Sequence, residues 1–195
     1  MAEVTEHATN SANDELLNGY TTDMLALETH IRTAIAGQIK DLDEASEAKS
    51  TLIRIHSMCD AHVHSLESIT QRREQNVGGV SKVVKQAVSS VLGAGAAAIG
   101  FVRTEKLPKD LRDTYTALSL AYVGSLMLHT CALTLGDEEI AATAKISLGD
   151  HAEAMMTLQH VIPAATVASL VKEGMTVDMT QMSTIAETIH SAWRK

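Results

Sequence analysis

The chain has 195 residues, 45% of them hydrophobic and 3% aromatic, and a formal net charge of −8. This length fits one core with a small appendage. The apolar residues are mainly Ala, Leu, Ile, Val and Met, which favours an all-α fold over a β-sandwich. The negative charge argues against nucleic acid as a partner. Two cysteines are too few for a secreted disulfide framework and the first residues carry no signal segment, so we expect a cytoplasmic protein.

The chain begins with a segment unlike the rest. Residues 1–12 are small and polar, which predicts a mobile N-terminal arm. The first helix is predicted to begin near Asp14, because apolar residues recur at helical spacing from Leu17 to Ile35. Glu28 lies on the same line, so a carboxylate is expected within the buried face of this helix.

A charged turn over residues 40–47 leads to a second predicted helix, which ends near Glu74. Its apolar residues again recur at helical spacing, and one histidine falls among them. The predicted buried stripe consists of Leu52, Ile55, Cys59, His62, Leu66 and Ile69.

Residues 86–102 are uncharged and rich in glycine. Seventeen residues lie at the lower edge of the length that spans a bilayer, so membrane contact from Val88 to Val102 is one interpretation. The other is a buried connector whose glycines let helices approach closely. The acidic chain favours the connector.

A second hairpin is predicted after this segment. Its first helix begins at Pro108 and ends at Leu135, and its second helix opens at the acidic residues 137–139 and ends before Pro163. The predicted apolar stripe of the first helix consists of Leu111, Tyr115, Leu118, Tyr122, Ser125, His129 and Ala132, and the stripe of the second helix includes His151.

Residues 164–195 are predicted to form a C-terminal extension of short helices that packs on the bundle or on a partner. The last of these helices has one apolar face, which consists of Met182, Ile185, Ile189 and Trp193. We expect this extension and the Gly-rich segment to provide contacts in a homo-oligomer.

Two hairpins separated by a long connection are what a four-helix bundle with one crossover requires, so residues 13–163 are predicted to form one bundle domain. The run LRDTYTALSLAYVGSLMLHTCALTLGD, the following helix that ends in VIP, and DMLALETHI around Glu28 resemble the ferritin-like superfamily, more narrowly a poorly characterised bacterial branch. The resemblance implies a ferritin-like four-helix bundle in a bacterial protein with a stress-related, storage-like or structural role.

The chain departs from the metal-binding pattern of that superfamily. Members that bind two irons carry a Glu on each of two helices and a Glu-x-x-His pair on each of the other two. Glu28 matches a single carboxylate and His62 matches the His of a pair, but Cys59 stands where the Glu of that pair belongs. The stripes that contain His129 and His151 offer no carboxylate. A conventional di-iron centre and its oxygen chemistry are therefore not expected.

Four titratable side chains nevertheless fall within apolar stripes: Glu28, His62, His129 and His151. Such groups must be paired, hydrogen-bonded or bound to a metal when they are buried. One carboxylate and three imidazoles suit a single Fe, Zn, Mn or Cu ion, provided that the four lie at one level of the bundle. The alternative is a satisfied polar cluster in a structural bundle, and the sequence alone slightly favours it.

The sequence contains no phosphate-binding loop, H-E-x-x-H, CxxC or nucleophile elbow, so no catalytic or cofactor-binding residue is assigned. This favours a non-enzymatic role. Three functional hypotheses remain: a stress-related or structural bundle, a protein that binds at most one transition-metal ion, and a self-assembling or membrane-associated protein.

Overall fold

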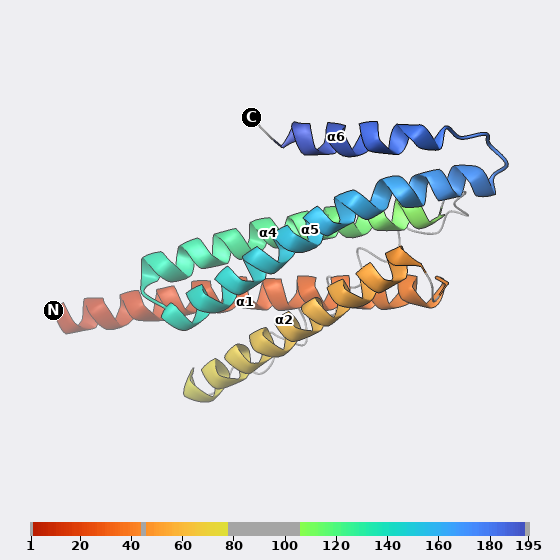
Figure 1. The fold of residues 1–195 in the computed structure, drawn as a ribbon. Helices are drawn as coiled ribbons and strands as arrows, with labels where there is room; N and C mark the ends of the chain where they lie inside the picture. Colours follow the sequence, from red (N-terminus) through yellow and green to blue (C-terminus); the bar gives the residue numbers. More distant parts are fainter. Residues whose placement is uncertain (1, 44–45, 78–105, 194–195) are drawn as a thin grey trace.

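The computed structural model describes residues 2–43, 46–77 and 106–193. Every regular element in these ranges is helical, and four long helices form the bundle (Figure 1). A 3-10 turn, η2, and the short helix α6 follow them. The bounds are α1 Ala2–Lys40, α2 Glu47–Val77, α4 Lys106–Leu135, α5 Glu138–Lys172, η2 Met179–Gln181 and α6 Met182–Ala192.

The long helices pair as two hairpins, α1 with α2 and α4 with α5, and α1 also packs on α4 and α2 on α5. Near the end of α2, Arg73 bonds to Asp14 of α1 and to Asp137 at the start of α5. Lys106 at the start of α4 instead bonds to Asp41, just after α1. Hence α2 ends and α4 begins at opposite ends of the bundle, as a single-crossover arrangement requires.

The buried stripe of α2 confirms the prediction, because all six of its predicted residues are buried. In α4, the prediction is correct only at alternate positions. Tyr115, Tyr122 and His129 lie at the edge of the core, and Thr114, Ala121 and Leu128 are buried in their place. Each buried residue directly precedes the predicted one in the sequence, so the predicted and the observed stripe both have helical spacing.

Two predicted boundaries are wrong. Helix α1 begins at Ala2 and not near Asp14, so residues 2–12 of the predicted arm are helical; this segment contains neither Gly nor Pro to end a helix. Helix α5 does not end before Pro163 but continues to Lys172. A proline inside a helix costs one backbone hydrogen bond, and Val161 and Ala165, both buried, keep the helix packed on the core on either side of it.

Other predicted boundaries are confirmed. Gly136 ends α4 with a φ of 81°, and the side chain of Asp137 caps α5 by accepting a hydrogen bond from the Ile140 backbone N–H.

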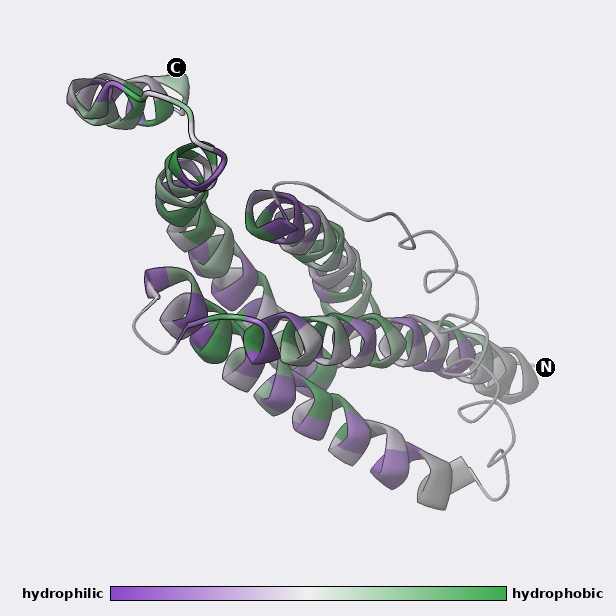
Figure 2. Cartoon of the chain, turned by 90° about the vertical axis from the view of Figure 1, so that its right-hand side faces the viewer, coloured by the Kyte–Doolittle hydropathy of each residue, from purple (hydrophilic) through white to green (hydrophobic). Residues whose placement is uncertain are grey.

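The C-terminal helix α6 lies beside the end of α5 at the periphery of the bundle, and none of its residues is fully buried (Figure 2). The Gly-rich segment, including Val88 to Val102, lies outside the described residues.

Candidate metal centre

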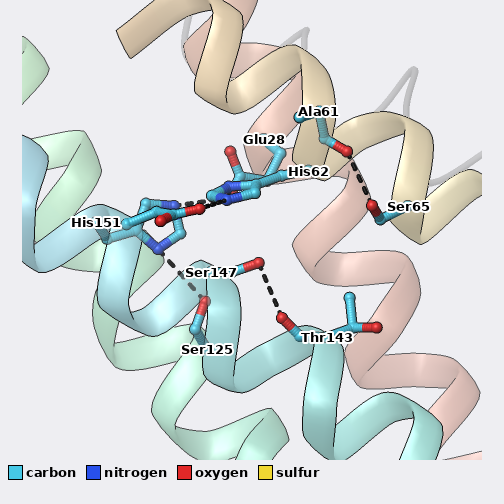
Figure 3. A network of polar contacts seen from close by, with 9 residues as sticks. Glu28, Ala61, His62, Ser65, Ser125, Thr143, Ser147 and His151 are labelled. Atoms are coloured by element: carbon cyan, nitrogen blue, oxygen red, sulfur yellow. Dashed lines mark hydrogen bonds and ion pairs between the residues drawn. The ribbon is translucent and has the colours of Figure 1, made fainter. Parts of the chain in front are cut away.

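Glu28 from α1, His62 from α2 and His151 from α5 meet in the interior of the bundle (Figure 3). Glu28 and His151 are 0% exposed and His62 is 4% exposed. One ligand atom from each of the three lies within 4.8 Å of the others. Three of the four titratable residues predicted to be buried are therefore brought together at one level.

A single carboxylate oxygen is the centre of this cluster. Oε1 of Glu28 lies 3.0 Å from Nδ1 of His62 and 2.7 Å from Nε2 of His151. The two imidazole rings stand edge to face, with centroids 5.1 Å apart. Two donors that each lie about 2.1 Å from a metal at right angles are about 3 Å apart, so these separations suit a shared ion as well as hydrogen bonds.

Two buried atoms of the cluster have no hydrogen-bond partner among the described residues: Oε2 of Glu28 and Nε2 of His151. The 2.7 Å contact of His151 Nε2 with Glu28 lacks the geometry of a hydrogen bond, although the two atoms are close. Leaving such groups unsatisfied in a core costs free energy. A metal ion fits this donor set because it would use both atoms.

The remaining ring nitrogens face other side chains. Nε2 of His62 lies 2.9 Å from Oδ2 of Asp150, and Nδ1 of His151 lies 3.4 Å from Oγ of Ser125 on α4. Histidines that bind metals usually donate their second N–H in this way. The sequence interpretation missed Asp150 because it flanks the apolar stripe of α5, and its place next to His151 in the sequence does not show that it contacts His62.

In the metal-free cluster, the pKa values of Glu28 and His62 are shifted by burial and by their mutual interactions. Burial raises the pKa of Glu28, but its close contacts and charge interactions with the imidazoles of His151 and His62 outweigh burial and lower this pKa to about 2. Burial lowers the pKa of His62, but Glu28 and then Asp150 raise it above its ordinary value. Below this raised pKa and without a metal, the imidazolium of His62 therefore joins two carboxylates.

Cys59 lies one turn before His62 on α2 and is fully buried. Burial and the neighbouring charge of Glu28 raise the pKa of its thiol. Cys59 is therefore a neutral thiol beside the carboxylate.

His129 lies outside this cluster. Its Nδ1–H donates a 2.7 Å hydrogen bond to the backbone carbonyl of Ala141 on α5. Ala141 precedes His151 by ten residues, which corresponds to about 15 Å along a helix. The predicted set of four therefore reduces to three, and His129 is a histidine at the edge of the core with a backbone partner.

The described helices and this cluster define an all-α helical bundle with a buried Glu-His-His constellation. The chain matches no known protein family and no curated protein sequence. The crystal structure of a protein from Xanthomonas campestris pv. campestris is similar, with a TM-score of 0.65 and 19% sequence identity over 84% of this chain and 99% of that chain. At this identity the likeness concerns the fold alone.

Proposed function

We propose that this protein is a ferritin-like bundle that binds one transition-metal ion through Glu28, His62 and His151. The observation that carries the proposal is the convergence of three buried donors from three helices. Two of these donors, Glu28 and His151, each have an atom without a hydrogen-bond partner in the part of the chain that the structure describes. Two imidazoles and one carboxylate are the donor set of several zinc sites and of non-haem iron sites. Such an ion has coordination positions left for water or another small ligand.

The placement of the donors supports the ferritin-like resemblance. In di-iron bundles, each histidine follows a Glu by three residues. Here the positions three residues before His62 and His151 hold Cys59 and Leu148. Ser125 of α4 faces His151 where a carboxylate of the fourth helix would lie in that scheme. Neutral side chains thus occupy the places of three carboxylates, which supports binding of one ion and not two.

The ion would connect α1, α2 and α5, and the contact between His151 and Ser125 extends this connection to α4. Because the unfolded chain does not hold these three donors together, the free energy of metal binding would add to the stability of the fold. We therefore assign the ion a role in stabilising the bundle, within the stress-related or storage-like physiology that the resemblance implies.

Metal analysis tests this proposal directly. Untagged protein reconstituted separately with Fe²⁺, Zn²⁺, Mn²⁺ or Cu²⁺ is expected to retain about one equivalent of at least one of these ions, and His151→Ala is expected to lose it, because three donors are the minimum for a tight site. His129→Ala is the matched control and is expected to retain the ion. Less than about a tenth of an equivalent in the wild type, or an equal loss in both variants, would contradict the proposal.

A second candidate function, self-assembly, rests on the outer face of α4. Helices α4 and α5 are more hydrophobic than α1 and α2 (Figure 2), and both are long and apolar enough to span a membrane by length and composition alone. Leu120, Val123 and Met127 recur at helical spacing on α4 and are exposed. An exposed apolar face of this kind is typical of an interaction surface. We propose that it contacts a second copy of the chain.

Val123→Glu tests this assembly. Val123 is 48% exposed, and Ile53 on α2 is 45% exposed, so Ile53→Glu is a matched control on a more polar helix. Light scattering after size-exclusion chromatography is expected to show a dimer for the wild type and the control and a monomer for Val123→Glu, because a buried unpaired charge opposes association. A monomeric wild type contradicts the assembly, and binding of this monomer to liposomes would assign the face to a membrane.

A further inference from the structure

His62 is the one histidine of the cluster whose two ring nitrogens both lie within hydrogen-bond distance of a carboxylate. Nδ1 lies 3.0 Å from Glu28 and Nε2 lies 2.9 Å from Asp150. Glu28 is fully buried, whereas the side chain of Asp150 is 43% exposed. The two carboxylates therefore differ in role: one lies inside the cluster and the other lies at the protein surface.

We propose that Asp150 is the positioning residue of the metal site, which holds His62 so that Nδ1 faces the ion and controls how fast the ion leaves. This inference rests on the proposed metal binding. If Nε2–H donates to Asp150, Nδ1 is the unprotonated nitrogen and is directed at Glu28 Oε1 and the ion. His151, which directly follows Asp150 on α5, supplies its Nε2 to the same ion. Two consecutive residues of α5 therefore act on one ion, His151 as a ligand and Asp150 through His62.

The position of Asp150 also links the buried site to solvent. Among the side chains hydrogen-bonded to the two histidines in the described chain, Ser125 is buried and Asp150 reaches the surface. Asp150 lines a surface pocket of about 330 Å³ together with Met58 and Glu153. Since water occupies about 30 Å³ per molecule, this volume accommodates several water molecules beside the carboxylate of Asp150.

This geometry predicts separate effects on affinity and on rate. Loss of the Asp150 carboxylate frees the ring of His62 to rotate and opens its outer edge to water in the pocket. Loss of such an outer partner weakens metal binding by about 10–100-fold. Release should become faster by a similar factor, because most changes in affinity at one site appear in the dissociation rate.

The test uses the full chain and Zn²⁺ as the probe. Affinity is measured by competition with a chromogenic chelator, and release is measured after mixing with excess chelator. Asp150→Ala is expected to bind about 10–100-fold more weakly and to release the ion faster. Asp150→Asn keeps an amide oxygen that accepts the N–H of His62, so it is expected to restore part of the loss. If Asp150→Ala does not fold, Asp150→Asn replaces it as the test variant.

Glu153→Gln is the matched control, because it removes a charge from the same pocket and the hydrogen bonds of His62 in the described chain go to Glu28 and Asp150. It is expected to bind and release Zn²⁺ like the wild type. The Co²⁺ absorption spectrum should change in Asp150→Ala and stay unchanged in Glu153→Gln, which a purely structural role of Asp150 does not predict.

The outcomes separate this inference from the proposed function. If the wild type takes up no metal, both are wrong. If the wild type binds Zn²⁺ and Asp150→Ala has the same affinity, release rate and Co²⁺ spectrum, metal binding stands and the role of Asp150 is wrong. An equal loss in Glu153→Gln also overturns it, because the effect would then come from the charge of the pocket.

Discussion

Replacing Glu28 with Ala is expected to destabilise the metal-free protein by about 3 kcal/mol, the lower end of the range for breaking a buried ion pair. The substitution leaves the imidazolium of His62 in the core with Asp150 as its remaining partner among the described residues. Because Asp150 is partly exposed, the loss is not larger. Urea denaturation near pH 6 with a chelator measures the free energy of unfolding.

Ile31→Val is the matched control for this prediction, since Ile31 is buried on the same helix and the change should cost only about 0.5–1.5 kcal/mol. The triple variant Glu28→Leu, His62→Leu and His151→Leu is expected to be at least as stable as the metal-free wild type, because an apolar replacement removes the cost of desolvating the charges. A loss in Glu28→Ala no larger than that in Ile31→Val would show that the buried pair is not formed.

The contrast between these variants bears on why the cluster exists. A bundle that needs only stability is served better by leucine at the three positions than by groups that must be desolvated. If the triple variant is the more stable protein, retention of the cluster is explained by a ligand that the polar side chains bind. The stability measurements therefore discriminate between the structural and the metal-binding interpretation of the same residues.

The sequence predicted helix α2 better than α4 for a physical reason. Charged and polar residues surround the apolar stripe of α2, so only one face can be buried. Helix α4 has apolar residues on all sides, and two stripes with the same spacing compete. The structure selects the stripe with Thr114, Ala121 and Leu128, and this places His129 at the edge of the core.

The sequence predicted which residues of the site are buried, but not how the helices are shifted along the bundle axis relative to one another. Burial of Glu28, His62 and His151 follows from helical spacing within each helix. Whether residues of different helices meet depends on how far each helix is shifted along the bundle axis, and a shift of two turns already separates them by about 11 Å. The same limit explains the omission of Asp150, whose contact with His62 depends on the register of α5 against α2.

The stability of the metal-free protein is expected to be greatest between about pH 4.5 and 6.5. The pKa of Glu28 is lowered from 4.5 to about 2, so its contribution is present above pH 4.5 and is lost as the pH falls towards 2. At 1.36 kcal/mol per unit, this loss is about 3 kcal/mol. The pKa of His62 is raised from 6.5, so its contribution is complete below pH 6.5 and is lost as the pH rises through the higher value in the folded state.

A bound metal should remove the loss of stability on the alkaline side of this profile. The ion competes with the proton on Nδ1 of His62, so binding releases a proton, and stabilisation by the ion increases as the pH rises towards the raised pKa of His62 in the folded state. Denaturation between pH 5 and 8.5, with chelator and with saturating Zn²⁺, measures the two curves. They should diverge with increasing pH in the wild type and in His129→Ala, and they should coincide in His151→Ala. A constant separation in the wild type would mean that the ion does not displace the proton of His62, and the assignment of this residue as a ligand would be wrong.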